Sequence, residues 1–428
     1  MKIIRKASGA FQAHLSANIS KLRSSSSIII SSAPSQTKDD TPQKTDQELK
    51  MFQSKIERNS AQTHFFPTMQ FNLKTISYGE KTLTSAYPQQ SNVNEVIELM
   101  TRTGATNIIG VGNGAAIDLA KACYYKRIAD DHDDDIGELI LNPSTLGAIG
   151  TATSEHCLLL DTEEEALMPV YSSSTIDKDA RSIIIDESSI SIPSWLTRDI
   201  QNKKRTNIAT ITDNVLASLV VALDAAHAMG DDGVIEEGKI SCLNECIQSS
   251  ARYLSSIQNS PNDFNVAENQ EFAISAVLHA GQLLSFGREN SLSTRRNIAI
   301  ALSASILPKH FPHGNWSTFT ASLLPGVVNA VNNCDEADEN EILIDSISTL
   351  LNLESQASPS HLVEWFERLD KNSMSSGVLE IPSLSSLSEG APGFSELLTK
   401  VEDHSAFTQC VDADSDYLEN ILVSSLNR

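Results

Sequence analysis

The sequence lacks long apolar runs and has few cysteines. No stretch of its 428 residues approaches the roughly eighteen consecutive apolar residues of a membrane-spanning helix. Its six cysteines are scattered along the chain, which indicates free thiols in a reducing compartment rather than a disulfide framework. Cys242 and Cys246 lie four residues apart but have no second pair to complete a zinc site, so we expect them to be structural.

The sequence is also poor in basic residues. It carries 32 Lys and Arg against 55 Asp and Glu, which gives a formal net charge of −23. Such a charge repels phosphate backbones and anionic lipid surfaces, so we expect neither nucleic acid nor membrane as a partner. With 40% apolar and 20% charged residues the composition is that of an ordinary globular protein, and the length allows two domains with a core each.

Acidic residues are missing from the N-terminal segment, where none occurs before Asp39. Basic residues alternate there with serines, which is the composition of a mitochondrial transit peptide. The same segment also fits the start of a fold, because apolar residues from Phe11 to Leu22 lie at helical spacing and residues 24–34 (SSSSIIISSAP) contain a short apolar strand. We expect a cytoplasmic protein, with a mitochondrial location as the alternative.

The two halves of the chain differ in their apolar pattern. The first half predicts strands near 28–31, 71–78, 107–111 and 182–186, and helices near 42–57, 94–104 and from Gly114 onward. Such alternation is typical of a Rossmann-like α/β domain with a parallel sheet. The second half contains long segments that are apolar nearly all round (213–229, 271–286, 296–307), which indicates helices buried in a bundle. We therefore predict an α/β domain over 1–190 and an all-α helical-bundle domain over 191–428.

A glycine-rich turn connects one predicted strand to the next helix. Its sequence is VGNGAAIDLAKA (111–122), and the glycines from Gly110 to Gly114 let the backbone approach a ligand closely. The first N–H groups of a helix point outward and attract anions such as a pyrophosphate. Asp118 and Lys121 follow within two turns, where one is placed to hydrogen-bond and the other to meet phosphate. The turn lacks the usual dinucleotide fingerprint, so a plain strand-to-helix connection is the alternative.

Blocks along the whole chain resemble motifs of the iron-containing alcohol dehydrogenase superfamily, which includes glycerol dehydrogenase, maleylacetate reductase and dehydroquinate synthase. The glycine turn is similar to the family's GGGSxxDxAK motif. Other blocks resemble further motifs in the family's order: NPSTLGAIGTATSE (142–155), RSIIIDESSISIPSWL (181–196), ATITDNVLASLVVAL (209–223), VLHAGQLLSFG (277–287) and FPHGNWSTFTASLLPGVVNAV (311–331). The resemblance implies the two-domain fold of this family and a homo-oligomer.

The resemblance also implies a divalent metal, iron or zinc, held by an aspartate and three histidines. Asp213 and His313 match two of these ligands, and they would also be the catalytic residues. Ala217 stands at the histidine position four residues after the aspartate, and the remaining histidine position is replaced as well, with Ala299 and Ser303 fourteen and ten residues before His313. Two ligands are fewer than the three of a catalytic zinc-type site, which argues against tight metal binding. His279 and His310 are possible substitutes.

A nicotinamide cofactor, NAD or NADP, is the second group that the resemblance implies. The residues that match its binding positions are Gly112, Asn113, Gly114, Asp118, Lys121, Ser144, Thr145 and Thr153. Ser32 stands where the family has the aspartate that holds the adenosine ribose. A carboxylate there repels a 2′-phosphate, so its loss leaves the choice between NAD and NADP open.

These residues predict an NAD(P)-dependent oxidoreductase that transfers hydride between the nicotinamide and a small-molecule alcohol, aldehyde or ketone. Asp213 and His313 would polarise the substrate oxygen. One alternative is a catalytically silent homologue that acts as a binding or assembly module, since alanine at position 217 can neither ligate a metal nor donate a proton. Another is a maleylacetate reductase-like enzyme, because the segment DADSDYLENILVSSL (412–426) is similar to the ending of that branch.

Overall fold

The chain forms two compact units in a computed structural model: Met1–Glu164 with Pro169–Leu196, and Glu165–Met168 with Thr197–Arg428. The structure describes residues 2–6, 9–18, 26–31, 63–67, 75–78, 81–84, 87–130, 137–161, 166–171, 181–187, 190, 203–229, 237–259, 266–286, 316–333, 340–353, 357–376, 381–384, 398–399 and 415–426.

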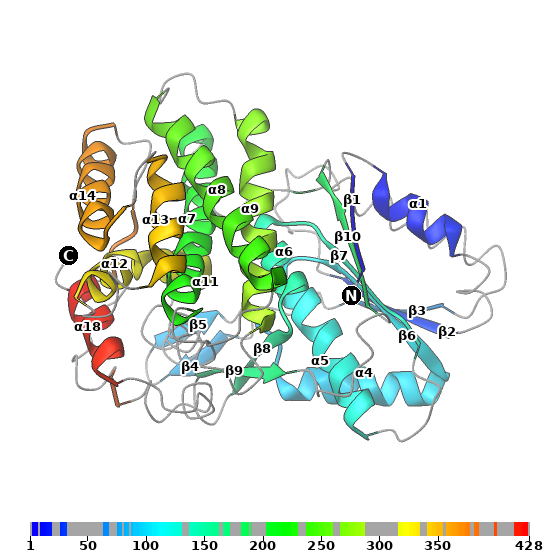
Figure 1. The fold of residues 1–428 in the computed structure, drawn as a ribbon. Coiled ribbons are helices and arrows are strands. Elements are labelled where there is room, and N and C mark those ends of the chain that lie inside the picture. The colour runs from blue at the N-terminus through cyan, green and yellow to red at the C-terminus, as the bar shows by residue number, and fades with distance from the viewer. Residues whose placement is uncertain are drawn as a thin grey trace. The chain divides into compact units, whose positions relative to one another are not determined.

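The first unit is built on a six-stranded parallel sheet (Figure 1). The strands, in spatial order, are β1 (Lys2–Lys6), β10 (Arg181–Asp186), β7 (Leu139–Pro143), β6 (Ala105–Gly112), β2 (Ser26–Ser31) and β3 (Thr63–Pro67). The central strands are almost continuously buried, as expected where both faces of a parallel sheet are covered. The predicted parallel sheet is therefore confirmed.

Two helices cover opposite faces of this sheet. On one face, α1 (Ala10–Ala17) joins a buried apolar cluster made by Ala10, Phe11, Ile29, Ile109, Val111, Ile140 and Ile184. On the other face lies α5 (Gly114–Asp130), so close that a Cβ on Gly110 of β6 would lie 2.7 Å from Ala120 Cβ. The sheet core is thus closed on both sides where β6 runs.

The N-terminal segment contains a strand that the sequence pattern did not predict. β1 pairs in parallel with β10, from Lys2 opposite Ser182 to Lys6 opposite Asp186. The carboxylate of Asp186 also accepts a hydrogen bond from the N–H of Ala10 at 3.1 Å, and so caps α1. The described residues from 2 to 18 are therefore an integral part of the first unit.

The remaining elements are two helices and two small two-stranded sheets, of which β9 extends into the second unit. α4 (Gln90–Thr103) buries Val96 and Met100 and ends at a left-handed C-cap, Gly104 with φ 65°, where the predicted helix also ends. α6 (Leu146–Thr153) follows β7. The strand predicted near 71–78 forms as β4 (Thr75–Tyr78), which pairs with β5 (Lys81–Thr84) in an antiparallel hairpin outside the large sheet. β8 (His156–Asp161) and β9 (Ala166–Tyr171) form the second two-stranded sheet.

Apart from Ala166–Met168 of β9, the described elements of the second unit are helices. They are α7 (Lys203–Met229), α8 (Glu237–Asn259), α9 (Val266–Phe286), α11 (Trp316–Ser322), α12 (Leu324–Asn332), α13 (Glu341–Leu351), α14 (Pro359–Ser376) and α18 (Ser415–Leu426). Helices α7, α8 and α9 pack against one another (Figure 1). The predicted change from alternating strands to helices is confirmed, while the helices expected near 42–57 and 296–307 lie outside the described residues.

Helix α7 is apolar enough to span a membrane, but it is buried inside the protein. Among the described residues, Ala209–Met229 is the one stretch long and apolar enough to cross a membrane, and 78% of its apolar window is buried inside the protein. The expectation that no stretch is long and apolar enough to span a membrane is therefore wrong by length and composition. The burial of this stretch is that of a core helix.

On α8, the buried Cys246 thiol contacts the carbonyls of Ser218 and Ala276, which fits the structural role predicted for it.

Candidate functional site

The glycine turn lies where the strand order of the sheet reverses. The chain leaves β2 for β3 on one side and later returns to β6 on the other side of β2. In open α/β sheets, ligands bind outside the carboxyl ends of the strands at such a switch point. Ser31, the last residue of β2, is in register with Val111 of β6, and Gly112 follows directly. The turn thus occupies the place where this architecture binds ligands.

Gly112 gives the turn its shape. Its φ of 130° is a backbone conformation that side-chain-bearing residues rarely adopt. Its carbonyl accepts a hydrogen bond from the N–H of Ser144 at 2.8 Å, and it is in register with Pro143 at the end of β7. The turn after β6 is therefore fixed to the turn after β7, and the first residues of α5 and α6 follow from neighbouring strand ends.

Asn113 caps the N-terminus of α5. The side chain is exposed, and its Oδ1 accepts a hydrogen bond from the N–H of Ala116 at 3.2 Å. Asn is a favoured N-cap residue because this bond satisfies an N–H group that the helix itself leaves free. The cap takes one of the donors that an anion at this helix end would use.

The N-terminus of α6 has a similar cap. Thr145 Oγ1 accepts from the N–H of Ala148 at 3.3 Å, and the buried Ser144 precedes it. We use the term cradle for the residues at these two helix starts: Gly112, Asn113, Gly114, Ser144 and Thr145. Each was predicted to bind the cofactor, and the structure brings them together.

Thr153 lies apart from the cradle. It is fully buried at the last turn of α6, and its hydroxyl donates to the carbonyl of Ile149 at 2.9 Å. Such a bond within the helix satisfies the hydroxyl without a ligand. The predicted cofactor contact of this residue is not supported by its position.

Lys121 and Asp118, on the helix that follows the turn, are both buried. The Lys121 ammonium, with no exposed area, donates to the carbonyls of Thr151 and Ser154 at 2.7 Å each and to the carbonyl of His156. An ammonium has three N–H donors, so these carbonyls use all of them. The predicted contact between Lys121 and a phosphate therefore does not fit this arrangement.

The electrostatics of this region follow from burial. Loss of water raises the pKa of the Asp118 carboxyl and lowers the pKa of the Lys121 ammonium, and the opposite charge of each partner counteracts both shifts. Burial lowers the pKa of His156 to about 3, with a smaller contribution from the Lys121 charge. His156 is consequently neutral near pH 7.

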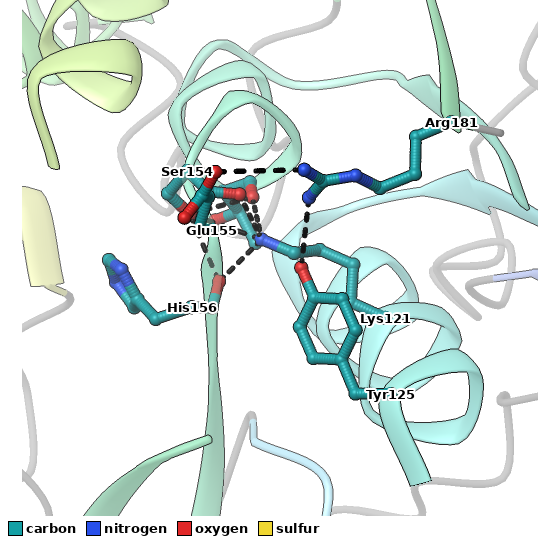
Figure 2. Close-up of polar contacts among 7 residues, drawn as sticks. Lys121, Tyr125, Ser154, Glu155, His156 and Arg181 are labelled. Atoms are coloured by element: carbon teal, nitrogen blue, oxygen red, sulfur yellow. Dashed lines mark hydrogen bonds and ion pairs between the residues drawn. The ribbon is translucent and has the colours of Figure 1, made fainter. Parts of the chain in front are cut away.

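An arginine that the sequence analysis did not select completes this buried group. Arg181, at the start of β10, donates to the Tyr125 hydroxyl at 3.3 Å and lies 3.8 Å from the Glu155 carboxylate (Figure 2). It is only 3% exposed. The available signal was a cation at the head of an otherwise apolar strand, RSIIID, which is an unusual place for a charge without a partner.

Asp213 and Ala217 lie one turn apart on α7 of the second unit. Oδ2 of Asp213 accepts a hydrogen bond from Thr318 of α11 at 2.8 Å, and the neighbouring Asn214 accepts one from Ser317 at 2.8 Å. Ala217 is 1% exposed and offers no donor atom. His313, the other predicted ligand, lies outside the described residues.

The described residues do not fit a divalent metal. Within the described parts of the chain, no group of three or more His, Cys, Asp and Glu side chains is placed to hold an ion. His279, one possible substitute, has its Nδ1 2.8 Å from the carbonyl of Ser275 in its own helix. His310, Ala299 and Ser303 fall outside the described ranges.

Comparison with known proteins identifies the fold. No family model and no curated protein sequence matches the chain. Solved structures do: an iron-containing alcohol dehydrogenase from Thermococcus thioreducens (15% identity, TM-score 0.64, 100% of this chain and 98% of that one) and a 1,3-propanediol oxidoreductase (14%, 0.66, 99% and 97%). The chain has the fold of the iron-containing alcohol dehydrogenases. The resemblance seen in the sequence motifs is confirmed at this level.

Maleylacetate reductases share this fold. The protein from Agrobacterium tumefaciens is 13% identical to this chain, with a TM-score of 0.59 over 100% of this chain and 96% of that one. Its similarity is no greater than that of the alcohol dehydrogenases. The comparison therefore gives no preference to the maleylacetate reductase alternative.

Proposed function

We propose that this protein is a nicotinamide-dependent oxidoreductase that binds the dinucleotide pyrophosphate at the cradle. The observation that carries the proposal is the position of the cradle, at the carboxyl ends of β6 and β7 beside the switch point of a parallel sheet. Two helix N-termini begin there, and N–H groups at helix starts favour anions. The alcohol dehydrogenase fold supports the same reading.

The chain's own residues would perform binding and orientation. The turn at Gly112 allows close backbone approach, while Ser144 and Thr145 supply hydroxyls at the second helix start. When bound, the nicotinamide supplies the hydride chemistry between an alcohol and a carbonyl compound. In the second unit, Asp213, whose Oδ2 accepts a hydrogen bond from Thr318, would orient a polar substrate group. We assign His313 the role of polarising the substrate oxygen.

Two features of the structure favour a second function, that of a catalytically silent homologue. Asn113 already caps α5, and Ala217 places a methyl group where a metal ligand would be needed. Both features fit a silent homologue that keeps the fold as a binding or assembly module.

Turnover with NADH or NADPH and a panel of short aldehydes and ketones separates the two functions. The proposal predicts consumption of the reduced cofactor, and His313→Ala is expected to lower kcat at least a hundredfold because the polarising group is lost. A second histidine, His361, lies on α14 of the helical unit, and its ring contacts Ser358 on the exposed surface. His361→Ala is the control. No turnover in the wild type, with or without added zinc or iron(II), would favour the silent homologue.

A further inference from the structure

Asp118 and Lys121 of α5 contact successive backbone groups on one edge of β8. Lys121 donates to the carbonyl of His156, and Asp118 accepts from the N–H of Leu158 at 3.1 Å. Residues two apart in a strand direct their backbone groups to the same edge. Leu160 continues that edge, because its N–H donates to the carbonyl of Pro88 at 2.7 Å. The two side chains therefore occupy the place of a neighbouring strand.

Lys121 also closes the C-terminus of α6. The carbonyls of the last helical turn have no partner within the helix and form the negative end of its dipole. The Lys121 ammonium meets the carbonyls of Thr151 and Ser154, and the Ser154 hydroxyl bridges from Thr151 to His156 (Figure 2). Lys121 thus places a positive charge at the negative end of the α6 dipole, where a cation stabilises the helix.

Fixing this end of α6 also fixes the end that belongs to the cradle. The helix has eight residues and is about 12 Å long, so it moves as one body. Thr145 caps the cradle end, while Thr151 lies beside the start of α5, with its Oγ1 3.6 Å from the position of a Cβ on Gly114. A shift at Ser154 would therefore move Thr145 relative to Gly112 and Gly114.

We propose that Lys121 and Asp118 are positioning residues of the cradle, which lock α6 and β8 to α5 and so hold the two helix N-termini at the spacing that a pyrophosphate requires. The identity of the ligand rests on the proposed function, but the lock itself does not. Both side chains act through the backbone, because Lys121 is fully buried and Asp118 is 3% exposed. Neither contacts the ligand.

Lys121→Met tests the lock against the matched control Lys126→Met. Lys126 lies on the same helix, but its ammonium contacts Asn94 at 2.7 Å on the exposed surface. For Lys121→Met we expect amide hydrogen exchange over residues 146–153 and at Leu158 to be at least tenfold faster. We also expect its affinity for NADH or NADPH to be at least tenfold weaker. Lys126→Met should stay within twofold of the wild type in both measurements.

Binding is measured well below the unfolding temperature, where a loss of stability alone leaves the folded fraction unchanged. Unchanged exchange of α6 in Lys121→Met would overturn the lock. Faster exchange, combined with a wild type that binds neither dinucleotide, would support the lock and refute the proposed function. If Lys121→Met does not fold, Ser154→Ala replaces it, since it removes only the bridging hydroxyl. That variant should show a smaller acceleration of the same amides, and no acceleration would contradict the lock.

Discussion

Asn113 illustrates how one side chain controls a helix end. Its amide oxygen takes up the Ala116 N–H, a donor that would otherwise be open to a bound anion. The bond stabilises the free protein and would compete with a phosphate bound at this end. Under the proposed function, an asparagine here is therefore expected to lower affinity relative to glycine.

Replacing Asn113 with glycine is expected to strengthen dinucleotide binding about threefold to tenfold, because about 1 kcal/mol of cap interaction no longer competes. The stability cost should be only a few tenths of a kcal/mol, since glycine is itself a tolerated N-cap. Calorimetric titration and urea unfolding measure both quantities. Binding that is unchanged or weaker in Asn113→Gly would show that the cap does not compete with the ligand.

His156 predicts a pH dependence of stability. Its pKa lies at about 3 in the folded protein, below the value of 6.5 for an unperturbed histidine, mainly because of burial. Between these values the unfolded chain binds the extra proton, so this group lowers stability as the pH falls from 6.5 towards 3. The slope is at most about 1.4 kcal/mol per pH unit.

His156→Gln should therefore lose stability less steeply than the wild type on acidification. Urea unfolding of both proteins at pH 7, 6 and 5 measures the difference in the free energy of unfolding. The carboxylates titrate in both proteins and cancel in the comparison. Parallel pH dependences would mean that the folded protein tolerates a charged His156.

At this scale, sequence reasoning found the cradle but not the environment of Lys121. The glycine turn is local, so its chemistry can be read from consecutive residues. The carbonyls that hold the Lys121 ammonium lie 30 to 35 residues further along the chain. Only the packing of α6 and β8 on α5 makes them neighbours, and a lysine near a glycine turn gave no sign of it.

At the scale of elements, the apolar pattern of the sequence predicts some of the short strands and misses others. β6 and β10 were predicted because their apolar runs stand out from helical neighbours. β1 (KIIRK) was missed because its basic ends fit a targeting segment equally well, and β7 (LILNP) because it runs directly into a loop motif. Both segments form strands because they pair in parallel with strands that are distant in the sequence.

Gly326 sets the contact between α12 and α18. A Cβ at this position would lie 2.2 Å from the carbonyl oxygen of Ile421 and 2.5 Å from Ser425 Oγ, so the C-terminal helix would have to move. We expect Gly326→Ala to lower the free energy of unfolding by about 1–3 kcal/mol. Faster amide exchange should appear in α18.

Gly238 of α8 is the matched control, because a Cβ there has no atom within 4 Å. Gly238→Ala is expected to be neutral or to stabilise by up to about 1 kcal/mol through lower entropy of the unfolded chain. Thermal unfolding of the two variants makes the comparison. Equal stability of both would show that α18 is not packed against Gly326 in solution.

At the scale of the molecule, the order of the sequence blocks was sufficient to predict the fold, although the block at 142–155, read as a loop, contains helix α6. The N-terminal segment was ambiguous for a physical reason: a basic amphipathic helix serves targeting and folding alike. In the structure, Phe11 is 2% exposed and packs in the sheet core. Only tertiary contacts distinguish such a helix from a leader.

Deletion of residues 2–18 should therefore destabilise the protein. The truncated chain loses β1, the cap at Asp186 and the burial of Phe11, whose removal alone is worth about 3–5 kcal/mol. We expect an unfolding midpoint at least 10 °C lower, or no cooperative transition in the first unit. A truncated protein as stable as the full chain would instead indicate a removable segment.

The central claim is that the cradle binds a nicotinamide dinucleotide. Isothermal calorimetry of the full-length protein with NADH and with NADPH tests it most directly. The account predicts saturable one-site binding of at least one of them, weakened in Lys121→Met and strengthened in Asn113→Gly. Flat titrations with both cofactors would contradict it and leave the glycine turn as a strand-to-helix connection of the fold.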